Sequence, residues 1–197
     1  MIASASPATE TIVIPLGYMF KVVAPPPDWM GTRAIDRVYS VSGHVSRDFL
    51  DYIPLWRHNG WWFFNSSATL RDIVRSEGLD AASLTLFYYE AFEKEYDEAE
   101  ENWRSIYPEG SFVTNVEPPK TKNLCGYDVV TFSVHTSPEC SPLSCNMLAR
   151  EMSVNKFCLF DDFSTAHDLV EGGAFDHSEP GPYRIIAVYN NLFGSED

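Results

Sequence analysis

The chain has 197 residues, 45% of them hydrophobic, with 5 Trp, 10 Tyr and 13 Phe, which excludes wholesale disorder and supports a packed core. This length suits one large domain or two small, tightly joined ones. The formal net charge of −14 argues against binding to a nucleic-acid backbone, because that requires clustered lysine and arginine. The same charge permits a basic protein partner, such as a nuclease or another nucleic-acid-binding protein.

The first half of the chain alternates β-rich and helical patterns after a small, polar segment, residues 1–11, that we expect to be a flexible N-terminus. Asn59-Gly60 marks a turn, and Ser66 or Ser67 is a candidate helix cap. The predicted elements are a strand at 17–23, a short helix at 46–53, a strand at 61–64, a helix that ends near Gly78 and a strand at 84–92.

The second half repeats this order. Trp62–Val74 and Cys158–Val170 resemble each other, since in each a short apolar run meets a capping residue and then a helical pattern. The predicted elements are a strand at 127–134, a helix over 146–152 capped by Ser144, a strand at 157–160, a helix capped by Asp161 or Asp162, and a strand at 183–189. We therefore predict an α+β fold of two similar β-α-β-α-β halves, an internal duplication, with helices packed on a mixed or antiparallel sheet.

The expected organisation follows from these halves. Residues 94–124 carry charges, Pro118-Pro119 and little apolar periodicity, which is typical of an excursion and linker. The predicted units are a flexible N-terminus at 1–11, a first α/β half at 12–93, an acidic excursion and linker at 94–124, and a second α/β half at 125–197.

The location of the protein is predicted from what the sequence lacks. No apolar stretch approaches the roughly 18 residues of a membrane span, and the first residues lack the basic and apolar regions of a secretory signal. We expect a cytoplasmic protein with no membrane contact, whose four cysteines stay reduced. The oligomeric state is not predicted.

An acidic run with interleaved aromatics is the main candidate for a binding face. Carboxylates steer a basic partner toward the surface, and aromatic side chains supply contact energy. Together with the net charge, this pattern is the basis for predicting an immunity- or inhibitor-like protein that neutralises or regulates a basic partner, while a merely solvated hairpin end or helix face remains the alternative for the run itself. The predicted contact residues are Glu90, Glu93, Glu95, Tyr96, Asp97, Glu98, Glu100, Glu101 and Trp103.

The loop at 135–146 is the candidate for an alternative function, a cysteine-dependent enzyme or a binder of anionic small ligands. If Cys145 lies in the first turn of a helix, unpaired N–H groups and the helix dipole favour its thiolate, and His44 or His135 could act as the base. A superposition of the halves would place His44 and Cys145 on opposite walls of one cleft. Ser141, Ser144 and Asn146 are the candidate ligand contacts.

A metal site is the less favoured interpretation of the same loop. Cys140 and Cys145 have a wide spacing for a zinc pair, with His135 before them and Cys158 after them. No compact pair of cysteines is present, and Cys158 lies within an apolar run, so we predict no metal and no cofactor. The sequence also contains no G-x-G-x-x-G, Walker, H-E-x-x-H or G-x-S-x-G motif.

Overall fold

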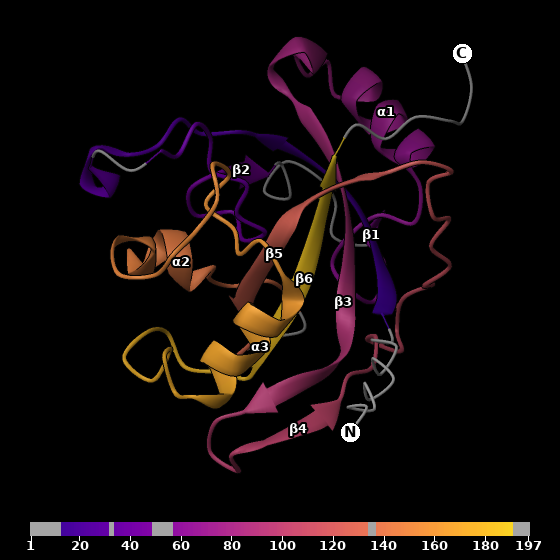
Figure 1. Cartoon of the computed structure of the whole chain (residues 1–197). Coiled ribbons are helices and arrows are strands. Elements are labelled where there is room, and N and C mark those ends of the chain that lie inside the picture. Colours follow the sequence, from indigo (N-terminus) through magenta and orange to yellow (C-terminus); the bar gives the residue numbers. More distant parts are fainter. Residues whose placement is uncertain (1–12, 32–33, 49–56, 134–136, 191–197) are drawn as a thin grey trace, which may run out of the picture.

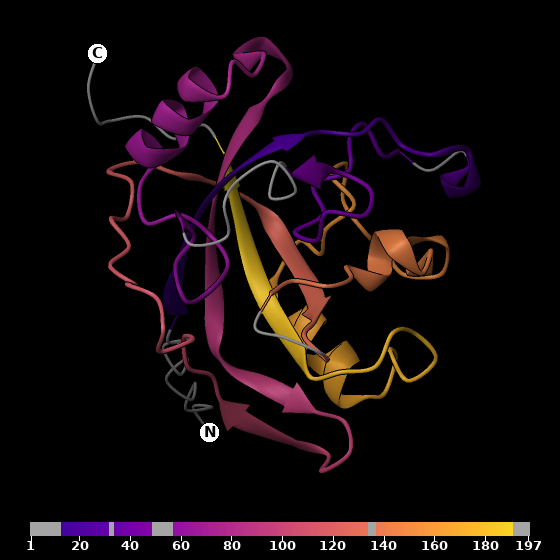
Figure 2. The ribbon, with the colours of Figure 1, turned by 180° about the vertical axis from the view of Figure 1, so that it is seen from behind.

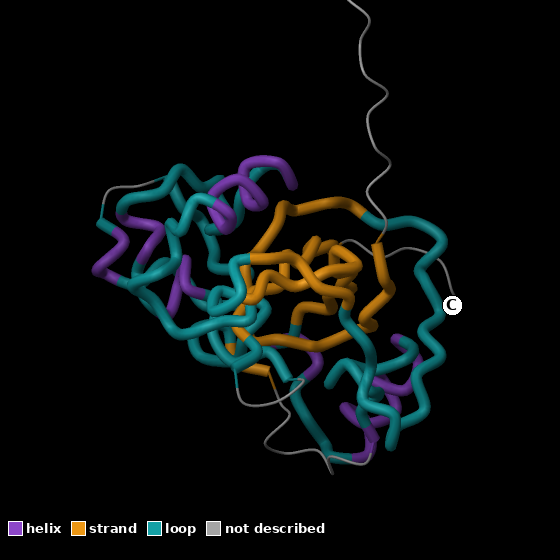
Figure 3. The backbone as a smooth tube through the Cα atoms, turned by 90° about the horizontal axis from the view of Figure 1, so that it is seen from below, coloured by secondary structure: helices purple, strands orange, loops and turns teal. Residues whose placement is uncertain are grey.

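One curled antiparallel sheet organises the chain in the computed structural model, which describes residues 13–31, 34–48, 57–133 and 137–190 (Figure 1). The strand order is β2-β1-β3-β6-β5, and β4 pairs with the end of β3 outside this path. The curl is plain when the sheet is seen from below (Figure 3). The strands are β1 (Val13–Val22), β2 (Arg47–Asp48), β3 (Thr85–Asp97), β4 (Asn102–Ser105), β5 (Asn123–Thr131) and β6 (Tyr183–Asn190).

Short helices surround the sheet. Ser66 caps the N-terminus of α1 (Ser67–Ser76) by accepting a hydrogen bond from the N–H of Thr69, and Asp162 caps α3 (Phe163–Glu171) through Thr165. Seen from behind, α1 and the β3–β4 hairpin lie at opposite ends of the sheet (Figure 2). Within the described residues, the remaining helices are α2 (Pro142–Cys145) and the 3-10 turns η1 (Asp28–Met30), η4 (Ala81–Ser83) and η5 (Leu148–Arg150).

The apolar faces of these elements form two buried clusters. The first joins the side chains of α1, such as Leu70 and Ile73, to Phe87 and Tyr89 of β3. The second places Ala166 and Val170 of α3 with Ile185 of β6 and other apolar side chains. Strand β6 contributes side chains to both clusters, and β3 contributes to the first and borders the second. The two strands pair directly with each other. The sheet is therefore continuous across the predicted boundary between residues 93 and 94.

A tight turn at 59–64 packs against the edge of β1. The Asn59 side chain holds it, since Nδ2 donates to Leu16 O at 2.9 Å and Oδ1 accepts from the N–H groups of Trp61 and Phe63. Phe64 and Tyr18 exchange two backbone hydrogen bonds. Gly17 allows this approach, because a Cβ there would lie 2.4 Å from Phe64 O.

A second turn with the same hydrogen-bond pattern packs against β5. Asn155 Nδ2 donates to Cys125 O at 2.8 Å, and Oδ1 accepts from the N–H groups of Phe157 and Leu159. A Cβ on Gly126 would lie 2.5 Å from Phe160 O. Each turn contains one non-glycine residue with positive φ, Trp62 at 65° and Cys158 at 62°.

The structure confirms an α+β fold with helices packed on an antiparallel sheet, and it corrects parts of the predicted order. The segments at 61–64 and 157–160 are turns with isolated bridges, because the asparagine side chains and the positive φ angles bend the chain. In place of the predicted helix at 146–152, α2 ends at Cys145 and η5 begins at Leu148. Met147, with a φ of 63°, separates them. Within the predicted helix at 46–53, residues 47–48 form β2 and residues 49–53 lie outside the described residues, as do residues 1–11.

Candidate functional site

The acidic run lies on β3 and its turn into β4, and part of it is neutralised inside the molecule. Glu95 is 7% exposed, and its carboxylate accepts from Arg104 Nε at 2.9 Å and from Arg184 Nε at 2.8 Å. Glu90 is 6% exposed and contacts the ammonium of Lys122. These two carboxylates already have cationic partners, so they support the sheet and offer little charge to a second molecule.

The remaining predicted acids lie nearer the surface. Asp97 pairs with Arg104, and Glu98 accepts a hydrogen bond from the Tyr183 hydroxyl at 3.0 Å. Glu93 is half-buried on β3, whereas Glu100 and Glu101 are exposed in the turn between β3 and β4. The acidic run therefore divides into a paired part within the sheet and an exposed part at the hairpin turn.

The predicted aromatics join the hairpin to α3. The ring of Trp103 stacks on His167 at 4.7 Å and packs edge-on against Tyr96 at 5.3 Å. Trp103 Nε1 also donates to Glu171 at 2.7 Å. Phe92 extends the cluster, with its ring 5.6 Å from Trp103. These contacts fix the position of the hairpin relative to the helix.

Exposed carboxylates from three segments act electrostatically on Tyr96. Desolvation raises the pKa of Tyr96, and the charges of Glu101, Glu171 and Asp176 raise it further. Glu101 comes from the hairpin turn, Glu171 from the end of α3, and Asp176 from the loop that follows α3. We call the set of Tyr96, Glu101, Trp103, His167, Glu171 and Asp176 the acidic-aromatic face. Sequence analysis missed its α3 members because they are about 70 residues from the hairpin in the chain.

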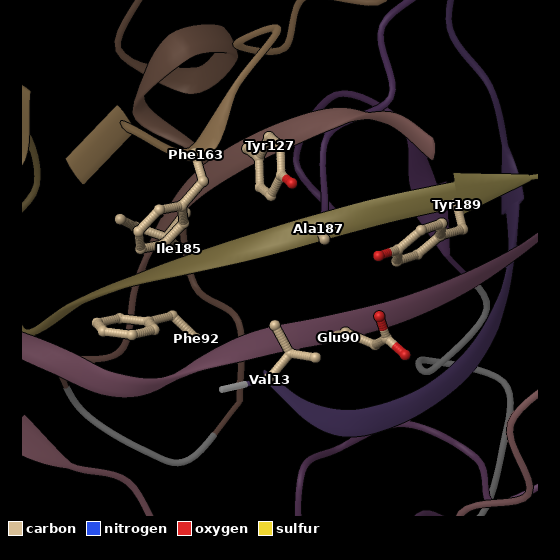
Figure 4. Close-up of a pocket in the computed structure, with 8 residues that line it drawn as sticks. All are labelled: Val13, Glu90, Phe92, Tyr127, Phe163, Ile185, Ala187 and Tyr189. Carbon is tan, nitrogen blue, oxygen red and sulfur yellow. The ribbon is translucent and has the colours of Figure 1, made fainter. Parts of the chain in front are cut away.

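A pocket of about 170 Å³ adjoins the acidic-aromatic face on the sheet (Figure 4). Phe92 and Phe163 stand at one end, and both also contact that face, Phe163 through His167 at 5.6 Å between ring centroids. Glu90 and Tyr189 stand at the other end, where Lys122 Nζ lies 4.2 Å from the centre of the Tyr189 ring. The lining residues are Val13, Glu90, Phe92, Tyr127, Phe163, Ile185, Ala187 and Tyr189.

The cysteine loop adopts a state that differs from the prediction. Cys140 and Cys145 form a disulfide, with their Cα atoms 6.2 Å apart, whereas the sequence led us to expect reduced cysteines. The reason is local, because α2 turns the chain back so that the two Cα atoms fall within the range of about 4.4–6.8 Å that a disulfide needs. Cys145 therefore holds no thiolate in this state.

The same loop contacts the segment that carries His44. The N–H of Ser42 donates to the Ser141 hydroxyl oxygen, and the N–H of Ser141 donates to the Ser42 hydroxyl oxygen, both at 3.1 Å. Ligand atoms of His44, Cys140 and Cys145 lie within 4.8 Å of one another, so the structure brings His44 and Cys145 together.

The other predicted contacts of this loop have local partners. The Ser144 hydroxyl donates to Ser141 O at 3.2 Å, and both serines are buried. Asn146 Oδ1 lies 3.1 Å from Cys140 Sγ. His135 lies outside the described residues, and Cys158 is buried in the turn at 155–160.

Beneath these loops the structure contains two buried ionisable groups, Lys21 and Asp128, that sequence analysis did not identify; Lys21 Nζ also lies 3.8 Å from Asp48 Oδ2. Lys21 donates to Ser42 O at 2.9 Å and to Ser46 O at 3.0 Å, and burial lowers its pKa to about 8. Asp128 accepts from the N–H of Val41 at 2.9 Å, and burial raises its pKa to about 6. A single lysine in an alternating strand is typical of a solvent-facing position, so the sequence offers no signal for its burial.

Comparison with known proteins returned no match for this chain among protein-family models, curated proteins or solved structures. None of the helices within the described residues has both the length and the apolar character needed to cross a membrane.

Proposed function

We propose that the protein binds a basic protein partner through the acidic-aromatic face, and that it neutralises or regulates this partner as immunity and inhibitor proteins do. The observation that carries the proposal is that Glu101, Glu171 and Asp176, from three segments, all act on the pKa of Tyr96, and that Glu171 also accepts a hydrogen bond from Trp103, whose ring packs on Tyr96. Charge steers the encounter, and aromatic side chains give lasting contacts.

The overall charge supports the same interpretation. The chain has 28 acidic and 14 basic residues, and Arg104, Arg184 and Lys122 already pair with acids of the β3 region. The carboxylates left around Tyr96 are therefore not matched by these three bases. A basic surface of a partner would supply the missing positive charge at low and moderate ionic strength.

The adjoining pocket favours a protein partner over a small molecule. Its volume of about 170 Å³ is smaller than the roughly 300–1,000 Å³ typical of sites for drug-sized ligands. It is lined mainly by apolar and aromatic side chains, so it suits one side chain of a partner, inserted beside Phe92 and Phe163. Such an anchor, with a charged rim around it, is a common arrangement in protein interfaces.

The test starts from proteins captured from the native cell lysate at low and high salt and identified by mass spectrometry. A basic protein that is lost as salt rises is then purified, and its affinity is measured by calorimetry. The triple variant Glu101→Gln, Glu171→Gln, Asp176→Asn should weaken binding roughly tenfold, mainly through slower association.

A matched variant controls for net charge alone. Asp72→Asn, Glu77→Gln and Asp80→Asn also remove three negative charges, but from the region of α1 at the other end of the sheet (Figure 1). This control should bind like the natural chain. Equal loss of affinity in both triple variants, or no loss in either, would show that the acidic-aromatic face is not the binding surface.

The second candidate is a cysteine-dependent enzyme or anionic-ligand binder at the 135–146 loop. It is favoured by the approach of His44 to Cys145, which places a base beside a nucleophile once the disulfide is reduced. The rate of alkylation of reduced Cys145 against pH tests it. A thiol that titrates at about 8.5 or above is not activated, and this candidate would then be abandoned.

We further propose that the two halves derive from an internal duplication and form related β-turn-α-β units. Support comes from the matched asparagine turns and from the pairing register, in which Gly17 faces Tyr89, Gly126 faces Val188, and Tyr89 faces Val188. The pair of Tyr89 and Val188 would then lie on the axis that relates the two halves. From this origin we expect Asn59 and Asn155 both to stabilise the sheet edge, Asn155 somewhat less because it is only half-buried.

A further inference from the structure

We propose that the reduced form of Cys140 and Cys145 binds one zinc ion together with His44. The three side chains come from two segments, and their ligand atoms lie within 4.8 Å of one another. Thiolate and imidazole are the ligands that zinc prefers in proteins. The proposal is independent of partner binding, because it involves no residue of the acidic-aromatic face.

Tetrahedral geometry requires only a small change from the disulfide state. Zinc–sulfur bonds of about 2.3 Å place two thiolates roughly 3.8 Å apart. Reduction frees the sulfurs to separate by side-chain rotation, while the Cα atoms, 6.2 Å apart, can stay in place. His44 is exposed, so its ring can turn toward the ion without losing buried contacts.

The backbone around the ligands is held firmly. Cys140 is anchored to the end of β5, since its N–H donates to the Thr131 hydroxyl at 3.2 Å and its carbonyl accepts from the N–H of Thr131 at 2.9 Å. The N–H of Cys145 donates to Ser141 O at 2.9 Å. The paired hydrogen bonds of Ser42 and Ser141 then hold the His44 segment against the cysteine loop. Such a preformed frame lowers the cost of ordering ligands when the ion binds.

The fourth position has an amide oxygen close by, Asn146 Oδ1, which also accepts from the N–H of Glu179 at 3.3 Å. Asn146 Oδ1 lies 3.1 Å from Cys140 Sγ and 3.5 Å from Cys145 Sγ. Zinc–oxygen and zinc–sulfur bonds of ordinary length place these ligands roughly 3.6 Å apart, so the amide oxygen is close to the required place. Asn146 or a water molecule would complete the coordination.

Binding depends on the redox state of the loop. Reduction of the disulfide takes two electrons and two protons, which a dithiol reductant supplies as it becomes a disulfide itself. Zinc then displaces the two thiol protons, and the two thiolates balance the charge of the ion. The oxidised loop has no thiolate and should not bind zinc.

The test uses the full chain, reduced with a phosphine and desalted, and titrated with Co²⁺ and then Zn²⁺. We expect one thiolate-to-cobalt charge-transfer band that saturates at one ion per chain and disappears as zinc displaces cobalt. His44→Ala should weaken zinc binding by at least about tenfold, whereas His167→Ala and Cys125→Ala should leave it unchanged. The oxidised chain should give no band.

A second measurement does not depend on the folding of any variant. In the reduced natural chain, Zn²⁺ should slow iodoacetamide labelling of Cys140 and Cys145, mapped by mass spectrometry, and should leave the labelling of Cys125 unchanged. No protection of these two cysteines, or a cobalt band that persists in the oxidised chain, would overturn the proposal.

Discussion

The asparagine turn at 59–64 gives a sharp test of how the sheet edge is held. Asn59 is 1% exposed, and its side chain makes hydrogen bonds to three backbone groups, the carbonyl of Leu16 and the N–H groups of Trp61 and Phe63. Asn59→Ala removes all three bonds and leaves those backbone groups buried. Alanine also cannot bridge the turn to β1.

The expected loss follows from these bonds. A typical hydrogen bond contributes about 0.5–1.5 kcal/mol net, so three bonds give about 1.5–4.5 kcal/mol of unfolding free energy. Asn155 makes the equivalent bonds to Cys125, Phe157 and Leu159, but it is only half-buried, so water can reach part of its site. Asn155→Ala should therefore cost somewhat less, about 1–3 kcal/mol.

Urea unfolding followed by circular dichroism measures both losses, from the shift of the urea midpoint relative to the natural chain. The slope of the unfolding free energy against urea concentration should stay constant. Asn123→Ala, an exposed position on β5, is the matched control and should stay within about 0.5 kcal/mol of the natural chain. A loss below about 1 kcal/mol for Asn59→Ala would refute the account of the turn. A large loss at one asparagine with none at the other would argue against equivalent halves.

Two further predictions concern the backbone and the buried charges. Gly17→Ala should lower the free energy of unfolding by at least about 2 kcal/mol, because φ is +128° and the new Cβ would lie 2.4 Å from Phe64 O. Gly78→Ala, with φ +65° and open space around it, should lower it by only about 1 kcal/mol. Similar losses for the two variants in chemical unfolding would contradict this. Burial raises the pKa of Asp128 from 3.8 to about 6, so between these pH values the folded chain keeps a proton that the unfolded chain releases. The contribution of this group to stability therefore falls as pH rises from about 4 to about 6. Asp128→Asn should remove that fall in unfolding experiments between pH 4 and 7; an unchanged pH dependence would show that another group is responsible.

Local patterns in the sequence predict most of the strands and caps. The apolar runs at 84–92 and 183–189 correspond to β3 and β6, and Asp162 caps α3 as expected. Periodicity and capping act between residues that are close in the chain, so they can be recognised without knowledge of the fold. The same patterns misplace strands at 61–64 and 157–160, because hydrogen bonds from Asn59 and Asn155 compete there with an extended backbone.

The candidate sites depend on contacts that no local pattern contains. The acidic run is visible in the sequence, but only the pairing of β3 with β6 and β4 shows that Arg184 and Arg104 neutralise Glu95. Lys21 follows a strand alternation that suggests solvent exposure, yet it is buried, and its ammonium donates to carbonyls of the segment at 42–46.

The amino-acid sequence by itself determined the charge, the α+β composition, the helix caps and the resemblance between two segments, because these depend on residue type and short-range spacing. The tertiary structure decided which carboxylates are buried and paired, which acids gather around Tyr96, and that His44 lies beside Cys140 and Cys145. These features depend on strand order and on loops packed from distant parts of the chain. Their positions are set by burial of the whole core, a property that spacing along the chain does not encode.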